Sequence, residues 1–159
     1  MSRGDSRVLY VPAGGGESRW VFGDKYTFKA DAETTGGAFS LLEAHVPAEA
    51  GPPPHVHEHS DEAFYLLEGA VQFTDGEEVH TVEQGGFIFV PRGSVHGFKN
   101  LGPEPAKMLA WFTPGGTEGF FKALGVPAVE GAPPPGRAQV LKDAEDAMKI
   151  VEKFDSKFV

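Results

Sequence analysis

The chain has 159 residues, of which 40% are hydrophobic and 23% charged, a length and composition that fit one globular domain. Its formal net charge of −9 argues against nucleic acid or an anionic membrane surface as a partner, because both repel a negative protein. The absence of cysteine excludes disulfides and cysteine-based metal sites. The sequence shows neither a secretory signal pattern at its start nor an apolar run of about 18 residues, so we expect a cytoplasmic protein.

Short apolar segments separated by glycine, proline, asparagine or aspartate occur from about residue 7 to residue 113, and many contain the β-branched and aromatic residues typical of strands. The expected strands are RVLYV, RWVF, YTFKA, AFSLLEAHV, EAFYLLE, VQFT, EEVHTV, FIFV, VHGFK and AKMLAWF. Asp75–Gly76 lies between two of them and predicts a hairpin. Such a succession of short strands indicates an all-β sandwich or barrel over residues 1–113.

The pattern changes after Trp111. Residues 114–126 predict a short helix that begins near Thr117, and residues 127–136 form a proline-rich connector. Residues 137–159 predict a C-terminal amphipathic helix, because apolar residues recur there at spacings of three and four. These residues are Val140, Leu141, Ala144, Met148, Val151 and Phe154. We interpret the stripe as a contact with the barrel or a neighbouring subunit, and a lid over a pocket is the alternative.

Three histidines, at positions 55, 57 and 59, occur within the sequence HVHEH. In an extended strand all three side chains share one face, with neighbours roughly 6.6 Å apart and the outer pair roughly 13 Å apart. Two neighbouring imidazoles can bind one ion through bonds of about 2.1 Å, whereas the outer pair cannot. The pair that binds is therefore His55 with His57 or His57 with His59, and the spacing alone does not choose.

The following strand supports the first pair. Glu62 shares a face with Phe64, so it points into a barrel interior if Phe64 does, and a carboxylate there is costly unless it is paired or bound to a metal. His59 then belongs to the polar turn that leads to Glu62. Under this arrangement His55 and His57 are the candidate ligands.

A second cluster lies in the sequence GGFIFVPRGSVHGFKN, residues 85–100. A strand ends at Pro91, the chain turns through Arg92–Gly93, and His96 shares a face with Phe98 in the next strand. An inward imidazole at position 96 would therefore fit without strain. Three imidazoles and one carboxylate suit a first-row divalent metal with positions left open for water or substrate.

These stretches, within residues 51–100, resemble the two sequence motifs of the cupin superfamily. The first matches as His55-x-His57-x4-Glu62-x6-Gly69, and the second as Gly85-x5-Pro91-x-Gly93-x2-His96-x3-Asn100. The resemblance implies a cupin-type jelly-roll β-barrel in which His55, His57, Glu62 and His96 bind one divalent ion of iron, manganese, nickel, cobalt, copper or zinc. One departure is Glu49, which stands where a glycine usually opens the first motif. We expect Gly51 to take the place of that glycine.

The wider pattern resembles the single-domain cupins grouped with quercetin 2,3-dioxygenase. This implies a homodimeric, metal-dependent dioxygenase that uses dioxygen on a hydroxylated aromatic or enolisable small molecule such as a flavonol. Glu62 would also be the catalytic base, with a pKa raised by its apolar surroundings. The alternatives are a non-catalytic binding or sensor cupin and, less favoured, a cupin isomerase or epimerase. Five residues chosen by strand face are expected to line the substrate pocket: Phe39, Phe64, Phe73, Phe98 and Trp111.

Overall fold

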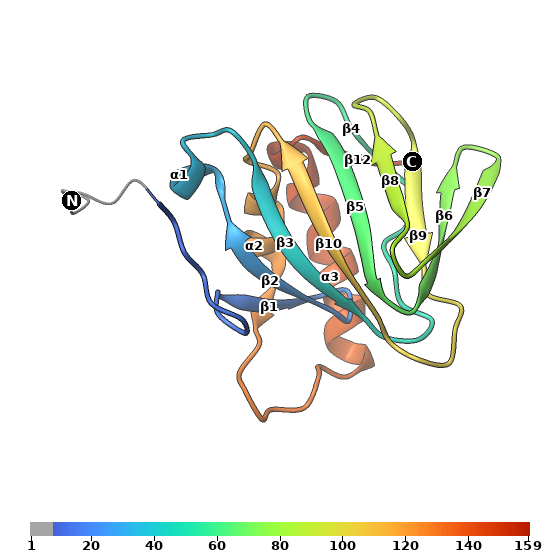
Figure 1. Cartoon of the computed structure of the whole chain (residues 1–159). Coiled ribbons are helices and arrows are strands. Elements are labelled where there is room, and N and C mark those ends of the chain that lie inside the picture. Colours follow the sequence, from blue (N-terminus) through green and yellow to red (C-terminus); the bar gives the residue numbers. More distant parts are fainter. Residues whose placement is uncertain (1–7) are drawn as a thin grey trace.

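The structure, a computed structural model, describes residues 8–159. Residues 1–7 of the expected barrel, including Arg7 in the first expected strand, lie outside the described residues, and residues 8–11 form no strand. Two antiparallel sheets account for the strands of the described part (Figure 1). The all-β fold expected from the sequence is confirmed.

The larger sheet has the strand order β11-β1-β2-β3-β10-β5-β8. Its strands are β1 (Ser18–Val21), β2 (Asp24–Ala30), β3 (Ser40–Val46), β5 (Asp61–Glu68), β8 (Phe87–Val90), β10 (Ala106–Thr113) and β11 (Val126–Pro127). The smaller sheet has the order β12-β4-β9-β6-β7. Its strands are β4 (His55–His57), β6 (Ala70–Asp75), β7 (Glu78–Glu83), β9 (His96–Lys99) and β12 (Ser156–Phe158). The helices are α1 (Ala32–Thr35), α2 (Glu118–Leu124), α3 (Arg137–Ile150) and the 3₁₀ turn η1 (Val151–Phe154).

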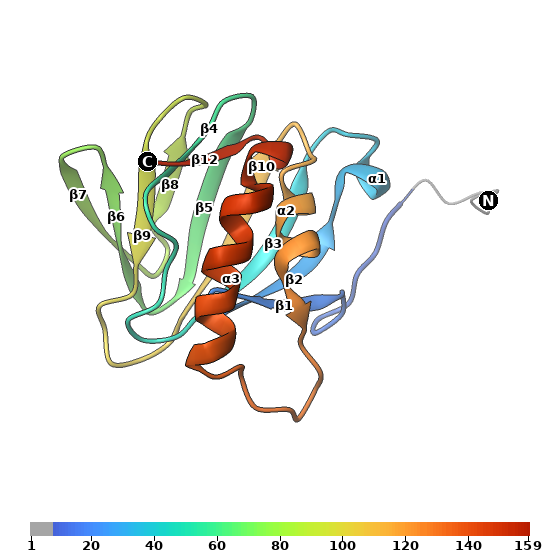
Figure 2. The same ribbon diagram turned by 180° about the vertical axis from the view of Figure 1, so that it is seen from behind.

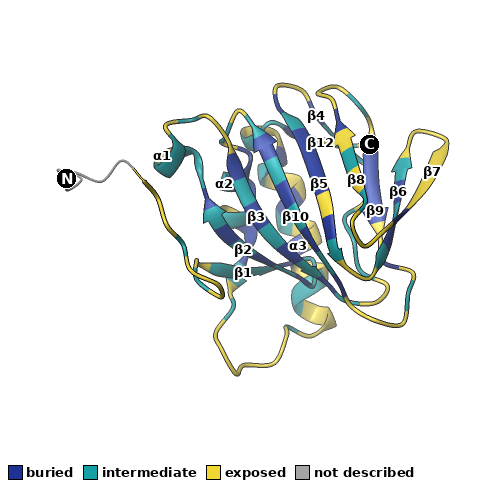
Figure 3. Ribbon diagram, viewed as in Figure 1, coloured by how far each residue is buried: buried dark blue, intermediate teal, exposed yellow. Residues whose placement is uncertain are grey.

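The apolar core lies between the two sheets, because alternate residues of the strands point inward. In β10 the even-numbered residues from Ala106 to Phe112 are buried, while the residues between them are partly exposed (Figure 3). The largest fully buried apolar side chains are Phe112, Leu42, Leu66, Met108, Val21, Val46 and Val71. The expected hairpin is also present: Asp75 pairs with Glu78, and Gly76 between them has a φ of 58°.

The C-terminal third is part of the barrel. Helix α2 packs on the inner face of the larger sheet through Phe121, and the centroid of its ring lies 4.6 Å from that of Tyr26. Helix α3 lies beside α2 (Figure 2). Beyond residue 113, β11 pairs with β1 and β12 pairs with β4, so both sheets extend past the expected end of the barrel. The single helix expected to cover residues 137–159 is wrong at its end, because the chain leaves α3 and returns as strand β12.

The expected apolar stripe of α3 is only partly buried. Leu141 is 60% exposed and Met148 is 66% exposed, whereas Asp143 is buried. The carboxylate of Asp143 accepts hydrogen bonds from the backbone amide of Phe22, at 3.1 Å, and from the side chain of Gln139, at 2.8 Å. These bonds turn the Asp143 face of α3 towards the β1–β2 turn, and of the predicted stripe Val140 lies there as well, 3.6 Å from where a Cβ atom would stand at Gly23. Among the described residues, no helix combines the length and the apolar character needed to cross a membrane.

Candidate metal centre

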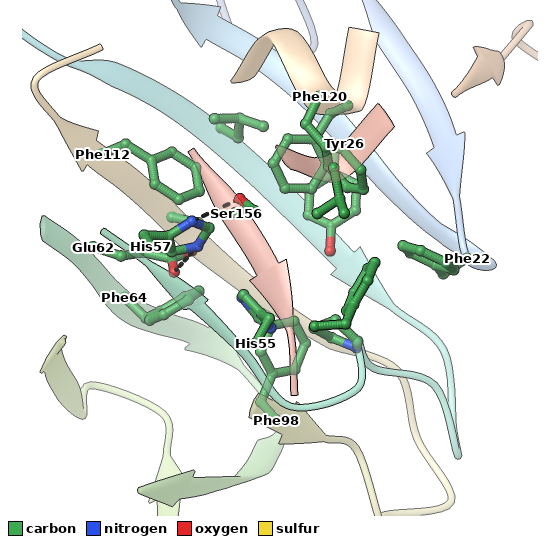
Figure 4. Close-up of a pocket in the computed structure, with 16 residues that line it drawn as sticks. Phe22, Tyr26, His55, His57, Glu62, Phe64, Phe98, Phe112, Phe120 and Ser156 are labelled. Atoms are coloured by element: carbon green, nitrogen blue, oxygen red, sulfur yellow. Dashed lines mark hydrogen bonds and ion pairs between the residues drawn. The ribbon is translucent and has the colours of Figure 1, made fainter. Parts of the chain in front are cut away.

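The structure brings the four predicted ligands together from both sheets, and Figure 4 shows three of them, His55, His57 and Glu62. His55 and His57 lie on β4, and His96 begins β9, where its Cα pairs directly with that of His55. Glu62 lies on β5 of the larger sheet and therefore approaches the three histidines from the opposite side of the barrel. One potential ligand atom from each residue lies within 4.8 Å of all the others.

These separations suit a single ion after a small adjustment. Two ligand atoms bound at about 2.1 Å from one ion can be at most about 4.2 Å apart. The Oε2 atom of Glu62 is already 2.8 Å from Nε2 of His96 and 3.1 Å from Nε2 of His57. Two ligand atoms 4.8 Å apart would therefore have to close by about 0.6 Å if they bound on opposite sides of the ion, and by more at any smaller angle. His59 is placed elsewhere, with an exposed side chain that contacts Asp155.

The three imidazoles are oriented through their Nδ1 atoms. In His55 and His96 this atom lies 2.9 and 3.0 Å from the backbone carbonyl oxygen two residues earlier. In His57 it lies 3.2 Å from the carbonyl oxygen of Asp155 and 2.8 Å from Oγ of Ser156. A carbonyl oxygen only accepts hydrogen bonds, so each ring carries a proton on Nδ1. Each Nε2 atom is consequently the one that faces the other ligands.

The charges of the cluster favour cation binding at neutral pH. Burial raises the pKa of Glu62, but the neighbouring His57 and His96 outweigh burial and bring that pKa down to about 2. The expectation that apolar surroundings raise this pKa is therefore wrong. Burial, helped by the positive charge of His96, lowers the pKa of His55 to about 4. Burial has the largest single effect on the pKa of His96 and lowers it, but the hydrogen bond with Glu62, the negative charge of Glu62 and the hydrogen bond with Ser94 together outweigh burial and leave this pKa above its ordinary value.

One buried atom supports the fit to a metal ion. The Nε2 atom of His57 makes no hydrogen bond within the described part of the chain, although it lies 3.1 Å from Glu62. A buried nitrogen left without a partner costs about 1–3 kcal/mol, so such an atom calls for an explanation. Its lone pair is available to an ion held among the four residues. Three imidazoles and one carboxylate are a donor set that first-row divalent metals accept, so these residues fit such an ion.

An apolar cavity adjoins the cluster and is lined by His55, His57 and Glu62 themselves. Aromatic residues form much of the remaining wall: Tyr26, Phe64, Phe98, Phe112, Phe120, Phe121 and Phe158. The ring of Phe112 meets that of His57 edge-on, with the centroids 5.3 Å apart. The cavity volume of about 40 Å³ leaves room for about three or four water molecules.

Two of the five expected pocket residues, Phe64 and Phe98, line this cavity. Phe73 packs behind them in the core, with its ring 4.8 Å from Phe64 and 5.4 Å from Phe98. Trp111 and Phe39 do not line it. Trp111 precedes the inward-facing Phe112 on β10 and so lies on the outer face of the sheet, against Phe87. Phe39 lies just before β3 and is exposed.

Sequence reasoning missed a buried polar pair next to the cavity. Asp24 is 1% exposed, and one of its carboxylate oxygens has no hydrogen-bond partner among the described residues. The other oxygen accepts a hydrogen bond of 3.2 Å from the hydroxyl of Tyr26, which lines the cavity (Figure 4). Burial raises the pKa of Asp24 to about 8. The alternation of Asp24, Tyr26 and Phe28 in β2 was the available signal, since it puts a carboxyl group on an apolar face.

The turn before β4 explains the departure from the first motif. Glu49 has a φ of 65°, the left-handed conformation that glycine adopts most readily. Glu49 itself therefore takes a conformation that glycine favours at this position of the motif, and Gly51, with a φ of 146°, takes a second one. Gly51 is needed for close approach, because a Cβ atom at this position would lie 2.1 Å from the carbonyl oxygen of Phe98 on β9.

Comparisons with known proteins agree with this geometry. Residues 42–112 match the family model described as "Cupin domain". The chain is 33% identical over 155 residues to a quercetin 2,3-dioxygenase of Bacillus subtilis, a match that covers 96% of this chain and 45% of that protein. It is 29% identical over 112 residues to a quercetin 2,3-dioxygenase of Aspergillus japonicus, covering 66% of this chain and 32% of that protein. The chain thus spans less than half the length of these two relatives.

A solved structure supports the fold. A protein of Thermotoga maritima, described as a predicted oxalate decarboxylase, superposes with a TM-score of 0.61 at 20% identity, covering 67% of this chain and 99% of that one. Two motifs in order, a two-sheet barrel with four candidate ligands gathered inside it, and these matches lead to one conclusion. The chain belongs to the cupin superfamily.

Proposed function

We propose that this cupin is a metal-dependent dioxygenase acting on a hydroxylated aromatic or enolisable small molecule, of which a flavonol is one example. The observation that carries the proposal is the cluster of three histidines and Glu62 that borders an apolar, aromatic-walled cavity. The similarity to a quercetin 2,3-dioxygenase along 96% of the chain supports the same reaction class.

The residues of the site divide the work. A divalent transition-metal ion held by His55, His57, Glu62 and His96 would act as a Lewis acid and make a coordinated hydroxyl group more acidic. Glu62 is ionised at neutral pH because its pKa is low, and a base this weak can accept a proton only from a hydroxyl group that the ion would make strongly acidic. The rings of the cavity wall offer planar apolar surface to an aromatic substrate and exclude water from the reacting groups.

The size of the cavity makes the proposal specific. A three-ring flavonol is several times larger than a space for about three or four water molecules. Binding of a flavonol therefore requires residues of the cavity wall to move. The aromatic residues that α2 and β12 contribute to this wall are Phe120, Phe121 and Phe158. A smaller enolisable compound needs less movement. Opening of the wall on substrate binding is thus part of the proposed cycle.

Metal analysis followed by oxygen-uptake measurements tests the proposal. The purified protein, loaded with each candidate ion in turn, is supplied with flavonols and smaller enolisable compounds. We expect oxygen consumption with at least one pair of ion and substrate. Metal binding and substrate binding without oxygen uptake would instead favour the non-catalytic cupin, and activity without any metal would favour the isomerase or epimerase class.

The role of Glu62 has a separate test. Glu62→Gln is expected to keep much of the bound metal, since the three imidazoles remain, but to lose turnover. Glu68→Gln is the matched control, because Glu68 lies on the same strand and is exposed. Full activity of Glu62→Gln would reject the base role.

The proposal includes a homodimer. The outer face of the larger sheet exposes three aromatic residues next to Trp111: Phe87 and Phe89, each 56% exposed, and Tyr65, 41% exposed. Together they expose on the order of 300 Å² of surface, a size at which the largest apolar patch of a protein is often functional. A second copy of this chain is the proposed partner, with these rings at the centre of an interface of about 800 Å² per protomer.

A further inference from the structure

The last strand of the chain lies directly against the strand that carries two of the candidate ligands. In the register of β12 and β4, Ser156 is opposite His57 and Phe158 is opposite His55. The backbone amide of Val159 also donates a hydrogen bond of 3.1 Å to the carbonyl oxygen of Pro54. Residues about 100 positions apart in the sequence thus share one sheet edge beside the candidate metal centre.

Among the candidate histidines, His57 is the one whose orientation depends on a distant segment. His55 and His96 are oriented by carbonyl groups two residues away in their own loops. The Nδ1–H of His57 instead donates to Oγ of Ser156, at 2.8 Å, and more weakly to the carbonyl oxygen of Asp155, at 3.2 Å. Both His57 and Ser156 are buried, so water does not readily replace this contact.

The turn that delivers Ser156 is anchored by its own contacts. Asp155 has a φ of 62°, a left-handed conformation that turns the chain out of η1 and back towards β4. Its carboxylate accepts hydrogen bonds from the backbone amide of His59, at 2.8 Å, and from Oγ of Ser60, at 2.9 Å. Ser60 in turn lies 3.0 Å from the hydroxyl of Thr117, which precedes α2. These contacts hold the turn before Ser156 in place, and none of them involves a candidate ligand.

We propose that Ser156 is a positioning residue of the metal centre, which fixes the ring of His57 so that Nε2 faces the other three ligands. The inference rests on the metal site of the proposed function but not on dioxygenase chemistry. A hydrogen-bonded partner fixes the orientation of a ligating imidazole, and its removal typically costs 10–100-fold in metal affinity. Because the carbonyl group of Asp155 remains as a weaker acceptor, we expect Ser156→Ala to weaken metal affinity by about tenfold.

Titration of the metal-free protein with Co²⁺ tests this inference, with the dissociation constant and the visible absorption spectrum as readouts. Ser156→Ala should weaken binding and change the spectrum, and Ser156→Thr, which keeps the hydroxyl group, should restore both. Lys157→Ala is the control for docking of β12, because Lys157 lies on the same strand and forms an exposed ion pair of 2.8 Å with Glu58. Its affinity should stay within about threefold of that of the unaltered protein.

Three results would overturn the inference: no Co²⁺ binding by the unaltered protein, unchanged affinity and spectrum in Ser156→Ala, or an equal loss in Lys157→Ala. The thermal midpoints of the metal-free variants show whether the barrel has stayed folded. If Co²⁺ binding depends on Ser156 but no loaded form consumes oxygen, the dioxygenase proposal fails and the role of Ser156 stands.

Discussion

The buried carboxyl group of Asp24 should give this protein a pH-dependent stability that one substitution removes. The pKa of Asp24 is raised by burial from 3.8 to about 8 in the folded chain. Between these values the unfolded chain has lost the proton while the folded chain still holds it. The stabilisation is therefore complete below about pH 4 and is lost as the pH rises towards 8. Asp24→Asn keeps a neutral side chain at this position and should not show the loss.

The magnitude follows from the pKa difference. When the folded chain holds one proton more than the unfolded chain, the free energy of unfolding falls by about 1.4 kcal/mol for each unit by which the pH rises. Over the roughly four units between the two pKa values, the loss is on the order of 5 kcal/mol. The buried amide of Asn lacks some hydrogen bonds at every pH, which costs about 1–3 kcal/mol but does not change the slope.

Urea unfolding of the metal-free protein at pH 5, 6, 7 and 8, followed by tryptophan fluorescence, measures this difference. The free energy of the unaltered protein minus that of Asp24→Asn should fall by about 3 kcal/mol between pH 5 and pH 7. Asp61→Asn is the control, because the hydrogen bonds from Arg92 lower the pKa of Asp61 and any effect appears only at lower pH. A difference that stays constant from pH 5 to pH 8 would refute the reasoning.

Three further substitutions probe other parts of the structure. Glu118→Ala removes the side chain that accepts hydrogen bonds from the backbone amides of Ala32 and Gly116. The free energy of unfolding, measured by chemical denaturation, should fall by about 1–3 kcal/mol for each amide, and a total loss below about 0.5 kcal/mol would contradict this. Phe112→Ala should cost about 3–5 kcal/mol in the same assay, because the ring is fully buried, and a smaller loss would mean that the cavity wall collapses to fill the space. Phe87→Lys should convert the proposed dimer into a monomer in light scattering, and a monomeric unaltered chain would reject the interface.

The four candidate ligands could be predicted because position and polarity agree along the chain. On β5 the carboxyl group of Glu62 lies on the same face as Phe64, and a carboxylate that points into the barrel needs a partner. That argument also set His59 apart from the pair formed by His55 and His57. The structure brings the chosen residues within 4.8 Å of one another.

The pocket wall was harder to predict because both faces of β10 are apolar. Leu109 and Trp111 point outward, while Ala110 and Phe112 point inward. Because the residues on both faces are apolar, their polarity does not show which face is the inner one. Trp111 and Phe112 were equally plausible from composition, and the structure places Phe112 at the cavity.

The last strand was missed for a different reason. The residues before it continue the spacing of α3, and the left-handed conformation of Asp155 that breaks the helix is not one that an aspartate requires. Asp155 is stabilised in this conformation by hydrogen bonds from His59 and Ser60, which are nearly 100 residues earlier in the sequence. Tertiary contacts of this kind override local periodicity, which is the limit of reasoning from pattern alone.

The origin of the ligands from opposite sheets has a consequence for the lifetime of the molecule. An ion bound to Glu62 of β5 and to the histidines of β4 and β9 would cross-link the barrel, the task that a disulfide performs in many small secreted domains, in a chain that has no cysteine. At a thousandfold excess over its dissociation constant, such an ion adds about 4 kcal/mol to the free energy of unfolding. Resistance to proteases would then follow the local supply of the ion, so that a shortage of the ion lowers the amount of intact protein.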